Sequence, residues 1–66
     1  MGFSKEELTE AGRQIDSTLH KLRETVKTLR GKEDPERYKS QITLAKRRIK
    51  AFEIAAALIE RELGRI

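Results

Sequence analysis

The 66-residue chain contains no cysteine and only one proline. Without cysteine it can form neither a disulfide nor a thiolate metal site, and it suits a reducing compartment such as the cytoplasm. A chain of this length buries only about 60% of its unfolded surface, so folding usually depends on disulfides, a bound metal or association with another chain. We therefore expect an oligomer.

The sequence also lacks a long uncharged segment. The run from residue 54 to 59 is six residues long and lies between Glu53 and Glu60, whereas a membrane-spanning helix needs about 20 apolar residues. At the start of the chain, Glu6 and Glu7 come before any apolar segment of the kind found in signal peptides. We expect a soluble cytoplasmic protein that does not enter a membrane.

Local signals predict where a first helix begins and ends. Ser4 and Glu7 have the spacing of a capping box, in which each side chain binds the backbone N–H of the other residue. Phe3 and Leu8 flank this box as a hydrophobic staple. Gly31 is the expected left-handed C-cap residue. The first helix is therefore expected at residues 5–30.

A short turn at residues 31–34 leads to a second start signal. Asp34 is the expected N-cap, and Pro35 suits the first helical position, where an N–H would have no helical partner. The second helix is expected at residues 35–63, with Gly64 as its stop. Because a short turn makes two helices antiparallel neighbours, residues 1–66 are expected to form one helical-hairpin domain.

Apolar residues recur in both helices at alternating steps of three and four residues, which is typical of coiled-coil packing. In the first helix they are Leu8, Ile15, Leu19, Leu22, Val26 and Leu29, with Gly12 as the one misfit. In the second helix they are Tyr38, Ile42, Ala45, Ile49, Phe52, Ala56, Ile59, Leu63 and Ile66. The predicted fold is an all-α antiparallel hairpin, in which Gly12 faces Ala56 in a layer that is small on both sides.

One edge of this hairpin is expected to face solvent. Residues of like charge become neighbours there, which is tolerable only where water screens the repulsion. The expected neighbours are Asp16 with Glu53, Arg23 with Lys46, and Arg30 with Lys39.

The second helix carries a further apolar stripe beside the opposite edge. Its residues are Leu44, Ala51, Ile54, Ala55 and Leu58. Singly exposed apolar side chains are common, but contiguous ones usually mark a contact. We expect an antiparallel homodimer about Ala51, in which Leu44 faces the partner's Leu58 and two hairpins form a four-helix bundle. A different protein partner could use the same stripe.

No residue pattern in the sequence indicates catalysis. The only histidine, His20, shares the outward face of the first helix with Asp16 and Glu24, a spacing typical of a solvated charged stripe. Metal sites in helical bundles place Glu and His at core positions, and no expected core position holds either residue. We expect no catalytic, metal or cofactor site, and hence a non-enzymatic interaction module of unknown biological role.

Basic residues support an alternative function. Residues 39–50 contain no acid, and the candidate contacts to phosphate are Lys39, Lys46, Arg47 and Lys50. Such a patch attracts nucleic acid, although no aromatic residue is free to stack on bases. A dimer of such hairpins resembles in architecture the RNA-binding repressor-of-primer family. The resemblance implies nucleic-acid binding as the alternative, and no residue role is carried over because fold analogy does not establish function.

A third class of function is binding to a membrane surface or to the groove of another protein. Residues 41–59 are basic in their first half and apolar in their second half, and basic amphipathic helices bind both kinds of surface. Folding and dimerisation explain the apolar stripe better.

Overall fold

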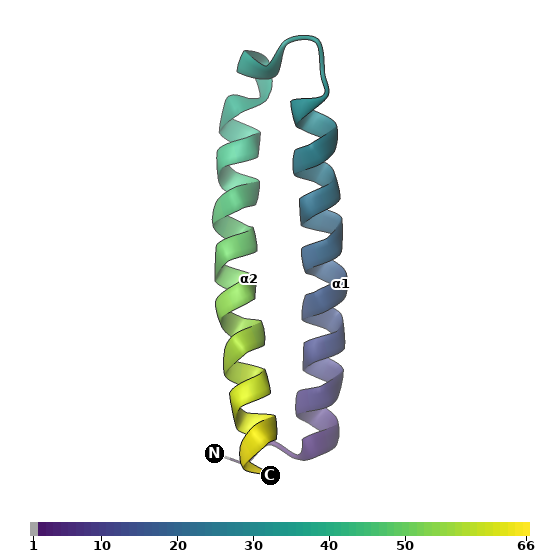
Figure 1. Cartoon of the computed structure of the whole chain (residues 1–66), viewed down its shortest axis with the longest axis vertical. Coiled ribbons are helices and arrows are strands. Elements are labelled where there is room, and N and C mark those ends of the chain that lie inside the picture. Colours follow the sequence, from purple (N-terminus) through teal and green to yellow (C-terminus); the bar gives the residue numbers. More distant parts are fainter. Residues whose placement is uncertain (1) are drawn as a thin grey trace.

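The computed structural model describes residues 2–66, so Met1 of the expected domain lies outside the described residues. Helix α1 (Lys5–Arg30) and helix α2 (Lys39–Arg65) lie side by side and antiparallel, joined by a short turn that contains the 3-10 helix η1 (Pro35–Tyr38) (Figure 1). The described residues contain no strand. The predicted all-helical hairpin is therefore confirmed.

The hairpin is a rod rather than a ball. Its Cα atoms extend over 48 × 15 × 14 Å. The radius of gyration is 15.0 Å, whereas a compact domain of this length has a radius of about 11 Å. A rod of two helices leaves much of each helix exposed, because each helix has only one neighbour.

The capping box at the start of α1 is confirmed. The backbone N–H of Ser4 donates to the Glu7 carboxylate at 2.9 Å, and the Glu7 N–H donates to the Ser4 hydroxyl oxygen at 3.1 Å. Hydrogen bonds from Ser4, chiefly from its backbone N–H, hold the pKa of Glu7 below its ordinary value of 4.5. The expected staple does not bury Phe3, whose exposed fraction is 58%.

The turn differs from the sequence prediction in two ways. Gly31 ends α1 with φ −80° and ψ −4°, which is right-handed rather than left-handed backbone. Asp34 makes no capping hydrogen bond through its side chain. The N–H of Arg37 instead donates to the backbone carbonyl of Asp34 at 3.2 Å, which closes a 3-10 turn. Because this turn takes up residues 35–38, α2 begins at Lys39 rather than at residue 35.

The end of α2 also differs from the prediction. The helix continues through Gly64 to Arg65, and the N–H of Ile66 donates to the carbonyl of Leu63 at 3.3 Å. Glycine lowers helix stability, but its φ need not be positive, so it does not by itself end a helix. Ile66, expected in the seam, is 68% exposed and lies at the end of the rod where α1 begins (Figure 1).

The seam between the helices follows the predicted repeat. Apart from Ile66, every repeat position is buried or partly buried, and Leu19, Val26 and Ala45 are the buried residues of the described chain. One pairing across the seam differs from the prediction, because the side chain that approaches Gly12 is that of Ile59 rather than that of Ala56. A Cβ atom built on Gly12 would lie 3.7 Å from Cγ2 of Ile59. The expected small layer is therefore filled within the hairpin.

The edge expected to face solvent is exposed, but its charge pairing is different. Arg23 donates to the Glu53 carboxylate at 3.0 Å and joins the two helices. The prediction from the sequence is instead that Lys46 is the neighbour of Arg23 and that Asp16 is the neighbour of Glu53. A long arginine side chain reaches diagonally to the next layer, so like charges need not be neighbours. The pair is about half exposed and contributes little to stability, since exposed ion pairs are worth roughly 0–1 kcal/mol.

Candidate interaction surface

The apolar stripe of α2 lies on the outside of the hairpin. The exposed fractions of Leu44, Ile54 and Leu58 are 47%, 52% and 53%, respectively. Ala51 is exposed and Ala55 is partly exposed. Leu44, Ala51 and Leu58 are seven residues apart, which is nearly two helical turns, so the three side chains lie in a row along one face. We call this row, with Ile54 and Ala55 beside it, the α2 stripe.

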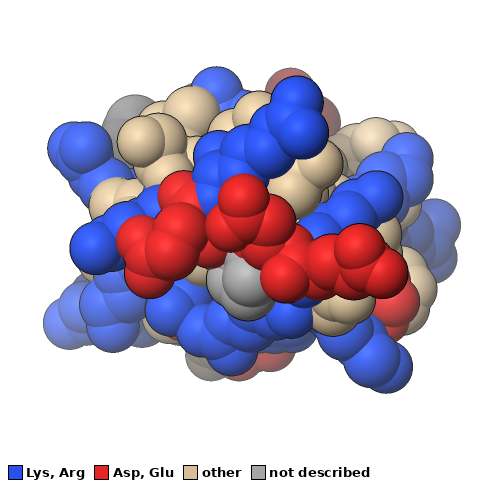
Figure 2. Space-filling model, turned by 90° about the horizontal axis from the view of Figure 1, so that it is seen from above, with Lys and Arg blue, Asp and Glu red and all other residues tan. Residues whose placement is uncertain are grey.

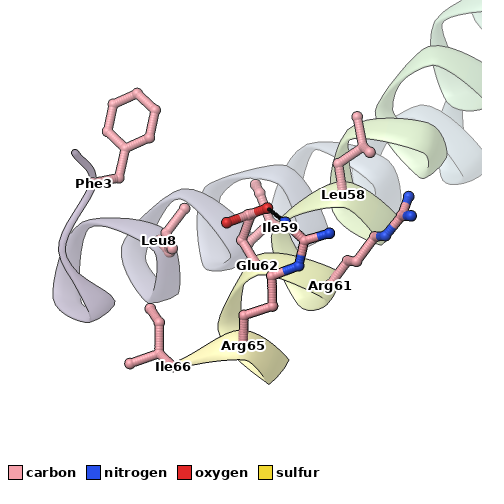
Figure 3. Close-up of a pocket in the computed structure, with 8 residues that line it drawn as sticks. All are labelled: Phe3, Leu8, Leu58, Ile59, Arg61, Glu62, Arg65 and Ile66. Carbon is pink, nitrogen blue, oxygen red and sulfur yellow. Dashed lines mark hydrogen bonds and ion pairs between the residues drawn. The ribbon is translucent and has the colours of Figure 1, made fainter. Parts of the chain in front are cut away.

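A second apolar feature lies at the end of the rod that carries both termini. It is a hollow of about 600 Å³, which we call the end hollow. Phe3 and Leu58 project on the same side of the hairpin, and Arg65 binds Glu62 beside them (Figure 3). The end hollow is lined by Phe3, Leu8, Leu58, Ile59, Arg61, Glu62, Arg65 and Ile66. Leu58 therefore belongs both to the α2 stripe and to the end hollow.

The sequence did not predict the end hollow. Phe3 was assigned to a local staple and Ile66 to the seam, so neither was expected to remain exposed. The signal that could have found them is the length of the helices, because apolar residues beyond the last layer of a hairpin have no facing helix to cover them.

Helix α1 carries two threonines whose hydroxyls are already paired. Thr18 and Thr25 are seven residues apart, so they share one face of α1, and their hydroxyls donate to the carbonyl oxygens of Gln14 and Lys21, each at 2.9 Å. Burial of a hydroxyl is costly only when its donor is left unpaired. A partner could therefore cover these threonines without removing a hydrogen bond.

The isolated hairpin exposes more surface than a folded protein of its size. Its accessible surface is 5527 Å², against about 4,300 Å² for a compact folded chain of 7.6 kDa. The excess is about 1,200 Å², and each partner in a standard protein interface buries about 800 Å². One interface of ordinary size would bring the exposed surface of this chain close to the usual value.

The candidate phosphate contacts also lie on α2, and one of them, Arg47, shares the face of the α2 stripe, because it is four residues before Ala51 and seven before Ile54. Lys39, Lys46, Arg47 and Lys50 are all exposed, and none of them makes an ion pair within residues 2–66. Seen from the turn end of the rod, acidic side chains cross the centre of the surface and lysine and arginine side chains surround them (Figure 2).

The remaining polar groups show no arrangement that suggests chemistry. His20 is exposed, and no three acidic or histidine side chains of the described chain gather as metal ligands. Every buried polar side-chain atom in residues 2–66 has a hydrogen-bond partner. Neither α1 nor α2 has a stretch apolar enough, over enough residues, to cross a membrane.

Comparison of the chain with known proteins returned no match to a protein-family model, to a curated protein or to a solved structure.

Proposed function

We propose that the protein is a non-catalytic association module that forms a homodimer through the α2 stripe. Two hairpins together make a four-helix bundle, with Leu44, Ala51, Ile54, Ala55 and Leu58 at the contact. The observation that carries this proposal is the row of exposed apolar residues on α2, which the single hairpin has no third helix to cover.

The size of the hairpin core supports the same conclusion. Leu19, Val26 and Ala45 are the buried apolar residues of the described chain, and no side chain in it is fully buried. Ordering a small chain costs roughly 1.5 kcal/mol per residue, which a core of this size does not offset. Burial of further apolar surface against a second copy adds hydrophobic stabilisation that the isolated hairpin does not have.

Light scattering combined with circular dichroism over a dilution series tests the proposal. We expect a helical particle of twice the 7.6 kDa chain mass, whose helix content falls as the dimer dissociates. A monomer that keeps its full helix content at every concentration would contradict the proposal, because the α2 stripe would then need no partner.

A matched pair of substitutions locates the contact. Leu58→Glu should yield monomer or unfolded chain, because a carboxylate in an apolar contact is left without a partner. Ala57→Glu is the control, since Ala57 is also exposed but points about 100° away from Leu58 around the helix. If Leu58→Glu retained a dimer of unchanged stability, the α2 stripe would not be the contact.

Nucleic-acid binding is a second candidate function, favoured by the exposed and unpaired state of the four basic residues within the described chain. Four phosphate contacts would make the binding constant fall with salt with a logarithmic slope of about −3 to −4. The probe is a fluorescent RNA duplex, measured by anisotropy at several salt concentrations.

Charge reversal of the patch tests this second function. The patch variant carries Glu at Lys39, Lys46, Arg47 and Lys50. The control variant has the same net charge and carries Glu at Lys5, Arg13, Lys21 and Lys32, which are also exposed. We expect the patch variant alone to lose binding. Equal loss in both variants would show that the chain binds phosphate through its overall charge, without a defined site.

A further inference from the structure

We propose that the two-fold axis of the dimer passes beside Ala55, so that Arg48 pairs with the partner's Glu62 and Leu44 enters the partner's end hollow beside Ile66. This inference rests on the proposed homodimer and specifies its register. The occupant of the end hollow is then a second copy of this chain.

The spacing of residues along α2 supports an axis at Ala55. In an antiparallel pair of helices, a residue a given number of positions before the axis faces the residue the same number of positions after it. Arg48 and Glu62 are each seven residues from Ala55, and Leu44 and Ile66 are each eleven residues from it. Seven and eleven residues are close to two and three whole turns, so all four lie on the face that Ala55 occupies.

Arg48 and Glu62 can pair with each other only across a dimer. Arg48 and Glu62 are 14 residues apart, which is about 21 Å along a helix, so they cannot pair within one chain. Arg48 is exposed and makes no ion pair among residues 2–66, while Glu62 binds Arg65 at 2.9 Å. An axis at Ala55 brings Arg48 to the partner's Glu62 twice, once at each end of the contact.

The apolar residues fit the same register. Leu44 approaches the partner's end hollow, where Phe3 and Ile66 are 58% and 68% exposed. Leu58 lies three residues after Ala55 and Ala51 four residues before it, so across the contact the partner's Ala51 lies within one residue of the height of Leu58. A large side chain opposite a small one lets the two helices interlock. The exposed apolar residues at the two ends of the contact thus cover one another.

An axis at Ala51 accounts for fewer of these features. It sets Leu44 opposite the partner's Leu58, which is a favourable contact. It also sets Arg48 opposite the partner's Ile54, since each is three residues from Ala51, so Arg48 gains no pair with the partner's Glu62. The apolar end hollow would then face the turn of the partner, where Glu36 lies 15 residues before Ala51.

A parallel arrangement of the two α2 helices is also less favourable. It brings each residue beside its own copy, so that Arg48 faces Arg48 and Arg65 faces Arg65. Both pairs would be like charges held at a contact.

Single-cysteine variants of the full chain test the register, because the chain has no native cysteine to interfere. A disulfide needs Cα atoms about 4.4–6.8 Å apart, which in an antiparallel pair occurs only close to the axis. Under mild oxidation we expect Ala55→Cys to form a covalent dimer and Ala51→Cys to remain uncrosslinked. Light scattering of the wild-type chain accompanies this measurement and reports whether a dimer exists.

The outcomes separate the register from the dimer itself. If the wild-type chain is dimeric and only Ala51→Cys crosslinks, the axis lies at Ala51 and the register is wrong while the dimer stands. Crosslinking of both variants indicates a parallel or unregistered dimer, and crosslinking of neither indicates another face; each overturns the register. A monomeric wild-type chain overturns the proposed function as well.

A charge-swap cycle tests the Arg48–Glu62 contact without relying on oxidation. Arg48→Glu and Glu62→Arg, each alone, should weaken dimerisation roughly tenfold or more, because each places like charges at both ends of the contact. The double variant should regain the wild-type dissociation constant. If the two single effects simply add, these residues do not face each other.

Discussion

A methyl group added at Gly12 probes the packing between the two helices of the hairpin at the one glycine of the seam. Gly12 is a helical residue of α1 with no positive φ, so alanine fits its backbone without strain. The new Cβ atom would lie 3.7 Å from Cγ2 of Ile59, which is ordinary van der Waals contact. The space beside Gly12 therefore admits one methyl group and gains a contact from it.

The expected gain has two parts. Alanine is about 0.8–1.0 kcal/mol more favourable than glycine inside a helix. A buried methyl group adds up to about 0.8 kcal/mol, and roughly half of that applies because the position is only partly buried. The sum is roughly 1–1.5 kcal/mol, which corresponds to a rise in melting temperature of about 5–10 °C for a chain of this size.

Thermal melting followed by circular dichroism, at one fixed chain concentration, measures this gain. Gly64→Ala is the matched control, since a Cβ there meets no other atom within 4 Å and the residue lies in the last turn of α2. We expect a smaller rise for Gly64→Ala than for Gly12→Ala. A fall in melting temperature for Gly12→Ala would show that the helices approach more closely there, or that a partner side chain occupies the space.

Two further predictions concern the helix ends. Ser4→Ala should lower stability by about 1 kcal/mol, as expected for loss of an N-cap, and melting temperature reports it. The lowered pKa of Glu7 means that its contribution is complete above pH 4.5 and is lost as pH falls through the lower folded-state pKa. Glu7→Gln should therefore destabilise the chain more at pH 7 than at pH 3; an equal loss of stability at both pH values would contradict a lowered pKa of Glu7 in the folded chain. Asp34→Ala should change stability by less than about 0.5 kcal/mol, because Asp34 makes no capping bond through its side chain. A loss of 1 kcal/mol or more, typical of an N-cap, would contradict this.

Much of the hairpin could be predicted from the sequence, because its determinants act over a few residues. The capping box joins Ser4 to Glu7 only three positions away, and both hydrogen bonds are present. The apolar repeat depends on helix geometry alone, and it located the buried residues Leu19, Val26 and Ala45 correctly. The exposure of the α2 stripe also agrees with the expectation that the hairpin itself does not cover it.

The turn could not be predicted as well, because several local signals compete there. Asp34 and Pro35 form a good helix start in isolation. In the folded chain the Arg37 N–H donates to the backbone carbonyl of Asp34 instead, so a 3-10 turn precedes α2. The choice depends on the span that the turn must bridge between two packed helices.

The helices, their antiparallel pairing and the row of apolar residues left on α2 follow from patterns in the sequence that repeat every few residues. Three other features emerge only when the chain is folded: Ile59 covers Gly12, Arg23 reaches Glu53, and Phe3, Leu58 and Ile66 line one hollow. These contacts join residues far apart in the chain. Their partners depend on the relative height of the two helices and on the reach of single side chains, which a repeat does not specify.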